Sequence, residues 1–579
     1  MQRIGEIVSA QKSPKSPSSP AQSYENEKTR KYDRQLRIWG DTGQYLIEIC
    51  NVCLVNASVT GTEVLKNLVL SGIGSFTIID GNKITKEDDN NFFCDRSSIG
   101  KNRGQVACSS LLELNPDVSG DYIEESPETL LDTNPDVFTK FSIVIVANCY
   151  NEKTLCKLSQ YLWDHNVPLI VAHSLGFVGL IRIQIREHPV IESHPDNVLE
   201  DLRLDKPFEE LREHFDSYED LITMPRQKIS RVPFLVILYK FLKSWQAKNN
   251  KSDDSLPKNY KEKEQLRNLI REAIDSINTR LQETNDNSDE GIEGELELEN
   301  FQEAIRAVNT ALVDSKFIPS ETQKILDDPR VEEVLDNKVH NTSFWLLVKG
   351  LKRFLKDKSN GCLPVRGSIP DMTADTQSYV ALQKIYSNKA KQDMDCLLNC
   401  LSSICDSSER FLEMIPEETI RIFCRNAHCL KLIRTSPLFY ELNPQDKNAS
   451  LTKLRETINC PESSDESNDL EFFLVLRAVM RFHTMHNRFP GYYQEESDNA
   501  TLKTCFKEVL SDLGCTHVPR DEYIQEVCRY GGAELHSVSA FIGGCAAQEA
   551  IKFITKQFTP LQSTLIYNAI TSTTITYGW

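Results

Sequence analysis

The chain has too little positive charge for a typical nucleic-acid-binding protein, and its apolar runs are too short for a membrane protein. Its 579 residues include 66 Lys and Arg against 84 Asp and Glu, a formal net charge of -18. Nucleic-acid binders present clustered Lys and Arg to phosphate, so we expect no nucleic acid as main partner. Apolar runs such as VPFLVILYKFL from Val232 are too short to cross a bilayer, and the polar N-terminus lacks the apolar core of a signal peptide. We therefore expect no membrane partner and a cytoplasmic location, with the nucleus as the alternative.

A regular cysteine framework is also missing. The 17 cysteines are scattered through a long chain, which favours reduced thiols over a disulfide scaffold. Cys50 and Cys53 form one CxxC, but no second pair completes a tetrahedral zinc site. His188 and His194 flank a proline-containing loop and lack a third ligand. We therefore expect no metal site.

Glycine is nearly absent where a nucleotide-binding fold would need it. Residues 51–68, NVCLVNASVTGTEVLKNL, predict a strand, a tight turn and a helix. A loop that cradles phosphate needs glycine, because the backbone must turn sharply and let the phosphate approach its N–H groups. Only Gly61 remains, whereas Asn56, Ser58 and Val59 stand where glycines are expected, and the β-branched Val59 would crowd a phosphate. This pattern indicates a nucleotide-type scaffold with a damaged site.

The residue patterns in the rest of the chain predict an α/β domain and a helical domain. Residues 1–27 are rich in Ser and Pro and are predicted to be disordered. Strand and helix patterns alternate up to residue 186, which is typical of a parallel sheet with helices on both faces. Long helical patterns fill residues 187–504, and residues 505–579 end in a helix with small residues and strand-like segments. We interpret this last part as returning to complete the first domain.

Six separated motifs carry a family resemblance. They are KYDRQLRIWG, GTEVLKNLVLSGIGSFTIIDG, RSSIGKNR, HPVIESHPDNVLEDLRLDKPF, LPVRGSIPDM and AFIGGCAAQEAIKFITKQF. In this order they resemble the activating enzymes of ubiquitin-like modifiers and, more closely, the regulatory subunits of two-chain neddylation-activating enzymes. The resemblance implies an α/β fold: a Rossmann-like pseudo-adenylation domain, residues 28–186 and 505–579, with a large, mainly helical insertion over residues 187–504.

The family adenylates the C-terminal glycine of a modifier with ATP and magnesium and then forms a thioester, and the resemblance locates the groups for this chemistry. Asp80 matches the ribose-binding acid and Arg103 lies at the position of a lysine. Asn90 matches an arginine position, and Tyr150 falls where a metal-binding Asp would be. Without that carboxylate, magnesium loses a hard anionic ligand. The resemblance thus implies that this chain binds no cofactor and that ATP and magnesium bind in the partner subunit.

Two further segments acquire roles through the resemblance. Arg34, in KYDRQ, matches an arginine that reaches into the ATP site of the other adenylation half, where a guanidinium holds phosphate oxygens as an arginine finger. The alternative is a surface arginine paired with Asp33 or Asp41. The family's partner contact follows LPVRGSIPDM, which here corresponds to Asp371 through Lys384. It includes Met372, Tyr379 and Leu382, of which the aromatic and the aliphatic suit a buried contact.

The resemblance implies a regulatory subunit whose partners are the catalytic subunit and the neddylation modifier. The family's thioester cysteine lies in that partner, so Cys362, beside LPVRGSIPDM and near Arg366, is interpreted as an incidental loop thiol. Three alternatives stay open. A noncatalytic scaffold should tolerate loss of Arg34, the regulatory subunit of the SUMO-activating enzyme lacks so large an insertion, and a dinucleotide-dependent oxidoreductase needs an intact glycine fingerprint.

Overall fold

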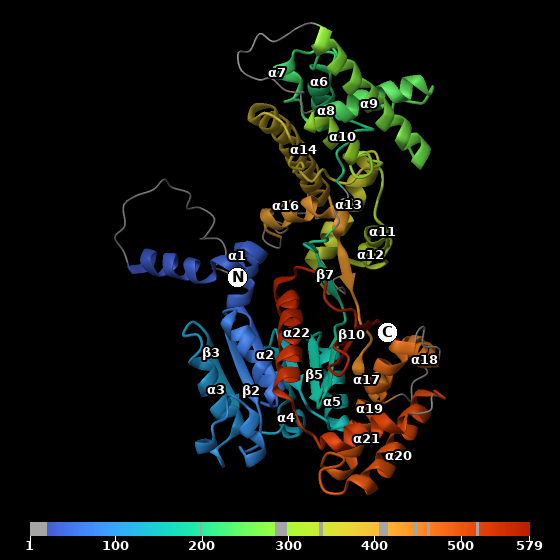
Figure 1. Cartoon of the computed structure of the whole chain (residues 1–579). Coiled ribbons are helices and arrows are strands. Elements are labelled where there is room, and N and C mark those ends of the chain that lie inside the picture. The colour runs from blue at the N-terminus through green and yellow to red at the C-terminus, as the bar shows by residue number, and fades with distance from the viewer. Residues whose placement is uncertain are drawn as a thin grey trace. The chain divides into compact units, whose positions relative to one another are not determined.

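The computed structural model describes residues 20–196, 200–283, 298–334, 340–404, 415–443, 449–459, 464–516 and 520–578. The chain forms two compact units, each with its own apolar core. The first combines Met1–His188 with Ile433–Trp579, and the second consists of Pro189–Leu432 (Figure 1).

An eight-stranded sheet is the centre of the first unit. Its order is β10-β9-β6-β5-β4-β1-β2-β3, with β1 Asn51–Val55, β2 Ser75–Ile79, β3 Ser119–Ile123, β4 Ile143–Ala147, β5 Leu169–Leu175, β6 Val178–Gln184, β9 Thr564–Asn568 and β10 Thr573–Tyr577. The pairs from β3 through β5 are parallel, and the pairs from β5 through β10 are antiparallel. The direction reverses because only Gly176 and Phe177 separate β5 from β6, which is the length of a hairpin turn. The α/β fold class is thereby confirmed.

Helices complete the first unit. They are α1 Pro20–Ile49, α2 Val59–Leu70, α3 Arg103–Leu112, α4 Pro127–Thr133, α5 Glu152–Asp164, α17 Leu438–Leu442, α18 Ala449–Asn459, α19 Ser464–His486, α20 Glu495–Leu513, α21 Asp521–Tyr530 and α22 His536–Thr555. The helices α2 and α22 lie side by side (Figure 1). Small residues allow this approach, since a Cβ at Gly543 would lie 2.7 Å from the Cβ of Glu63.

The structure shifts two of the expected boundaries. Helix α1 begins at Pro20, within the segment expected to be disordered, and proline suits a first helical position; residues 1–19 lie outside the described range. The return to the first unit begins at Ile433 rather than near residue 505. Helix α19 explains the earlier return, because it contacts β9 and α5 and buries Phe472 and Val475 in the core of this unit.

The second unit is mainly helical. Its helices are α6 Glu209–Asp216, α7 Arg226–Ile229, α8 Phe234–Lys248, α9 Tyr260–Glu283, α10 Glu299–Ala307, α11 Ser320–Leu326, α12 Arg330–Glu333, α13 Thr342–Asp357, α14 Thr376–Ser402 and α16 Glu417–Arg425. The short strands β7 His188–Val190 and β8 Lys431–Ile433 pair where the chain enters and leaves this unit. Within the described ranges, no helix combines the length and apolar character that a bilayer crossing requires.

Candidate functional site

An asparagine makes the turn between β1 and α2 that glycine would make in a phosphate loop. Asn56 has a left-handed φ of 72°, which asparagine tolerates better than most residues. Its side-chain amide donates to the carbonyls of Ala147 at 2.7 Å and Asn148 at 3.2 Å. Ser58 then caps α2 by accepting a hydrogen bond from the Gly61 amide at 3.3 Å. The turn is therefore fixed by bonds within the protein.

Gly61, the remaining glycine of this turn, is required by packing. A Cβ at this position would lie 2.6 Å from the carbonyl oxygen of Asn56 and 3.0 Å from the Cβ of Ala147. These distances are too short for ordinary contacts, so a larger residue would push α2 away from β1 and β4. Val59, the first residue of α2, is itself buried.

A carboxylate of the same chain lies at the N-terminus of α2. Glu534 Oε2 accepts hydrogen bonds from the Thr60 amide at 3.0 Å and from the Thr60 hydroxyl at 3.1 Å. Burial raises the pKa of the Glu534 carboxyl, against the opposing effect of hydrogen bonds from Thr60 and Asn148. Helix N-termini attract anions because their first amides have no partner within the helix. Glu534 therefore occupies the place that suits a phosphate.

Asp80 and Arg103 lie together in this site and bind each other. Arg103 donates from Nε to Asp80 Oδ2 at 2.8 Å, from Nη1 to Asp88 Oδ1 at 2.9 Å and from Nη2 to Asn56 Oδ1 at 2.5 Å. Asp80, which is 2% exposed, also accepts from the Ala57 amide at 2.9 Å. Burial alone would lower the pKa of Arg103, but Asp80 and Asp88 raise it. The two residues that match nucleotide-binding positions in the resemblance are thus occupied by protein partners.

Tyr150, which falls at the position of a metal-binding Asp in the resemblance, is buried and packs against other rings. Its ring packs against His173 and Phe489, with centroids 4.7 and 4.9 Å away, and its hydroxyl donates to the Ser174 carbonyl at 3.3 Å. Burial raises the pKa of Tyr150. Within the described ranges, no group of three or more His, Cys, Asp or Glu side chains could hold a metal. The residues present at this position do not fit a magnesium ion.

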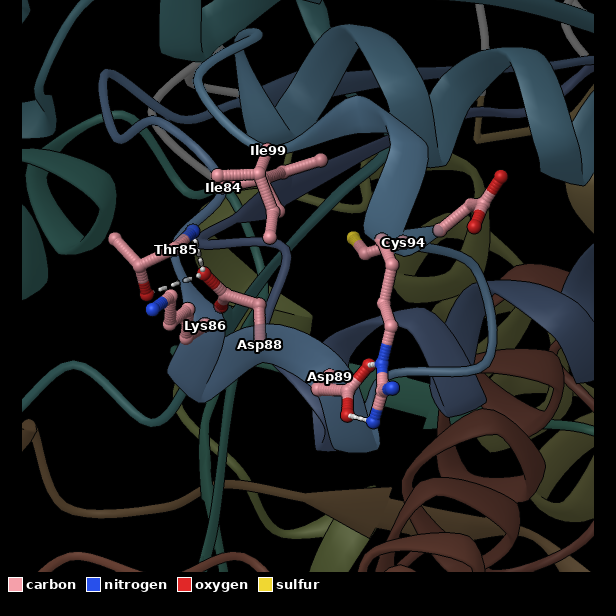
Figure 2. A pocket seen from close by; sticks show the side chains of 9 residues that line it. Ile84, Thr85, Lys86, Asp88, Asp89, Cys94 and Ile99 are labelled. Atoms are coloured by element: carbon pink, nitrogen blue, oxygen red, sulfur yellow. Dashed lines mark hydrogen bonds and ion pairs between the residues drawn. The ribbon is translucent and has the colours of Figure 1, made fainter.

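Asn90 stabilises the same arrangement from a neighbouring turn. Its side-chain amide donates to the Glu534 carbonyl at 3.0 Å. A cavity of about 260 Å³ lies beside this turn, and Figure 2 shows its lining. The three acids that line the cavity have partners: Asp88 accepts from the Thr85 amide at 2.8 Å, Asp89 pairs with Arg96, and Asp95 accepts from the Ser97 amide at 3.2 Å. Burial raises the pKa of Cys94 to about 12, so its thiol is no nucleophile at neutral pH.

Arg34 is an exposed residue of α1. The neighbouring Arg37 pairs with Asp33 at 3.0 Å, so Asp33 already has another partner. Within the described part of the chain, no hydrogen bond or ion pair involves Arg34. Its guanidinium is therefore available to a group from another molecule.

The segment from Asp371 to Lys384 is largely accessible. Val380 is 55% exposed, Asp371 and Lys384 are exposed, and Met372 and Tyr379 are half-buried. Leu382 corrects the expectation, because its side chain is 0% exposed and packs in the core of the second unit. A residue two positions after an exposed valine on a helix turns toward the opposite side, which explains the difference.

Cys362 lies in an unreactive environment. Its side chain is buried, and burial raises the pKa of the thiol while Arg203 opposes that shift. Catalytic thiols need a lowered pKa, so the structure gives Cys362 no nucleophilic character. The cations that act on this thiol are Arg203 and Lys206.

Sequence reasoning missed Glu534, which closes the site. It lies 474 residues from Thr60 along the chain and has no distinctive residue pattern around it. Asn148 and Ser174 were missed as well; Asn148 Oδ1 accepts from the Ser174 amide at 2.8 Å. An asparagine at the end of a buried strand would have been the available signal.

Comparison with known proteins gives consistent matches over most of the chain. The model of the ThiF family matches residues 32–577. A NEDD8-activating enzyme E1 regulatory subunit from Xenopus laevis is 46% identical over 553 residues, covering 95% of this chain and 98% of the relative. The protein of the same name from Drosophila melanogaster is 43% identical, covering 95% and 97%. The NEDD8-activating enzyme E1 regulatory subunit AXR1 from Arabidopsis thaliana is 38% identical, covering 94% and 95%.

Proposed function

Because the chain belongs to the ThiF family and, within it, to the NEDD8-activating enzyme E1 regulatory subunits, we propose that it is the noncatalytic subunit of a two-chain activating enzyme. Its partners in this proposal are a catalytic subunit and the neddylation modifier. The catalytic subunit binds ATP and magnesium, adenylates the modifier and supplies the thioester cysteine. This chain binds neither cofactor and supports the partner's active site.

The closed site at the N-terminus of α2 carries the proposal. The Thr60 amide donates to Glu534, and Arg103 divides its three hydrogen bonds among Asp80, Asp88 and Asn56. A nucleotide would have to displace these partners. Tyr150 would also provide it with no carboxylate for a magnesium ion. Binding ATP here would therefore break satisfied hydrogen bonds and bury new charge, which is unfavourable.

Arg34 supplies the contribution to catalysis in this proposal. It is exposed, has no ion pair in the described part of the chain, and resides in a protein whose own nucleotide site is closed. A guanidinium placed against phosphate oxygens of a neighbouring chain stabilises the charge that develops during transfer. Assembly would use the accessible part of Asp371 through Lys384, in which Val380 is exposed and Tyr379, half-buried against the core of the second unit, presents the rest of its ring.

The test is modifier-dependent exchange of pyrophosphate into ATP by the assembled enzyme carrying Arg34→Ala. Loss of an arginine finger slows phosphoryl transfer by roughly 10³-fold or more, and we expect a smaller but clear loss for adenylation. Arg34→Lys should recover only part of the rate, since an ammonium lacks the bidentate fork. The wild-type chain without its partner should show neither exchange nor a modifier thioester.

Arg37→Ala is the matched control, because Arg37 lies one helical turn from Arg34 and is exposed and paired with Asp33. It should leave exchange near the wild-type rate. Sedimentation of each variant with the partner checks assembly separately. Wild-type exchange by a well-assembled Arg34→Ala complex would contradict the role in trans and would favour a purely structural scaffold.

A further inference from the structure

A basic cavity of about 530 Å³ lies in the second unit beside the LPVRGSIPDM motif. The loop 365–368, α14 and α16 provide its walls; the lining residues are Val365, Arg366, Gly367, Ser368, Gln383, Ser387, Ala390, Lys391, Met394, Glu417, Arg421, Cys424 and Arg425. Four of them are cationic and only Glu417 is acidic. This excess of positive charge contrasts with the formal net charge of -18 for the whole chain.

Three of the four cations have unused capacity. The Nε of Arg366 is buried and makes no hydrogen bond. Lys391 and Arg425 are exposed, and no ion pair of either is found in the described ranges. Arg421 is paired, donating from Nε to Glu418 at 2.7 Å. A buried guanidinium N–H without an acceptor is unfavourable, so an anion entering this cavity would find donors ready to bind it.

Acidic side chains also lie next to the lining cations without lining the cavity themselves. Burial raises the pKa of the Glu200 carboxyl, and Arg366 acts in the opposite direction. Glu418 pairs with Arg421, and Glu192 also raises the pKa of that arginine. The lining cations that have no ion pair in the described ranges are Arg366, Lys391 and Arg425. These three cations come from the loop 365–368, α14 and α16, so they suit a ligand with more than one negative charge.

The loop that carries Arg366 is fixed in place. The Val365 amide donates to Asp393 Oδ2 at 3.0 Å, and the Gln383 side chain donates to the Gly367 carbonyl at 2.9 Å. Gly367 has a φ of 80°, and a Cβ there would lie 2.7 Å from the Cβ of Ala390. Glycine thus lets the loop approach α14 closely. The loop is thus fixed beside the cavity that Lys391 of α14 and Arg421 and Arg425 of α16 also line.

We propose that this cavity binds a small, multiply phosphorylated anion. Arginine forks match phosphate oxygens in a bidentate manner, and the volume lies within the range of pockets for small ligands, roughly 300–1,000 Å³. An acidic peptide would spread single charges about 3.4 Å apart along its backbone, whereas these cations surround one enclosed space. The proposal does not depend on the role of Arg34.

Isothermal titration of the full chain with tripolyphosphate tests the proposal. We expect saturable binding at one site, weakened when the salt concentration rises from 50 to 200 mM. The double variant Lys391→Glu with Arg425→Glu should bind at least about 100-fold more weakly, since each lost charge-assisted contact accounts for about tenfold. Both side chains are exposed, so folding should be retained, and the urea midpoint verifies this.

The matched control reverses Lys356 and Lys358 to Glu, two exposed lysines near the end of α13 that do not line the cavity. It should bind tripolyphosphate within about threefold of the wild type. Absence of saturable binding, or equal affinity in the Lys391 and Arg425 double variant, would overturn the proposal. Inorganic phosphate binding as tightly as tripolyphosphate would exclude a multiply phosphorylated ligand. A hexaglutamate peptide that binds more tightly than tripolyphosphate would replace it with an acidic peptide.

Discussion

Removal of the Glu534 carboxylate should destabilise the first unit. Glu534→Ala leaves the Thr60 amide and hydroxyl without the acceptor that lies 3.0 and 3.1 Å away, and it removes the hydrogen bond with Asn148. Hydrogen bonds to charged groups contribute about 1.5–3 kcal/mol each. Burial of the carboxylate opposes this contribution, so we expect a net loss of about 2–4 kcal/mol in the free energy of unfolding.

The pH dependence of the free energy of unfolding distinguishes the effect of the Glu534 charge from the effect of its side-chain shape. Burial raises the pKa of folded Glu534 above the ordinary value of 4.5. The folded chain therefore keeps this proton at pH values where the unfolded chain has lost it, and stability falls as pH rises from 4.5 through the raised pKa. Glu534→Gln has no such titration. Wild-type stability relative to that variant should accordingly decline as pH increases.

Urea unfolding between pH 5 and pH 8 measures both effects, provided that the slope m is unchanged. Glu522→Ala is the control, because Glu522 is an exposed carboxylate on α21 and should alter stability by less than about 0.5 kcal/mol. An equally small effect of Glu534→Ala, together with a pH-independent difference between wild type and Glu534→Gln, would refute the account of this carboxylate.

Three further changes test other parts of the structure. Gly61→Ala should lower the free energy of unfolding by about 1–3 kcal/mol, because its Cβ would meet the Asn56 carbonyl and Ala147; an unchanged urea midpoint would contradict this. Tyr379→Asp should weaken assembly with the catalytic subunit by placing a charge in an apolar contact, and unaltered co-sedimentation would count against that contact. Cys362→Ala should leave thioester formation by the complex intact, since burial raises the pKa of this thiol; loss of the thioester from a well-folded complex would assign it a catalytic role.

The parallel half of the sheet could be predicted from local sequence. Strands β1, β2 and β4 are short apolar runs that alternate with helical patterns, and such runs indicate buried parallel strands. The boundary at Ile433 could not be predicted in this way, because α17 through α20 have the same helical texture as the second unit. Only tertiary contacts, such as those of α19 with β9 and α5, assign them to the first unit.

In the candidate site, too, features formed by residues close together in sequence could be predicted, whereas contacts between distant residues could not. The sequence alone shows that Asn56 and Ser58 stand at positions where a phosphate loop has glycine. It also shows the acid Asp80 directly after β2. The role of Glu534 could not be predicted, because it depends on the contact of this carboxylate with the N-terminus of α2, which only the structure shows. The expectation that Leu382 contacts the partner was wrong for a related reason. Which side of α14 faces the core depends on how that helix packs.

The late position of β9 has a consequence for the protein's synthesis. Strand β6 gains its outer neighbour only when Thr564–Asn568 has been made, although β6 itself ends at Gln184. At about 5–20 residues per second, the ribosome needs on the order of a minute to span this interval. During that time the nascent chain exposes an unpaired strand edge, which is prone to aggregation, and the N-terminus of α2 awaits its carboxylate from Glu534. We therefore expect the emerging chain to need protection of this edge, by a chaperone or by its own later helices, until β9 has been made.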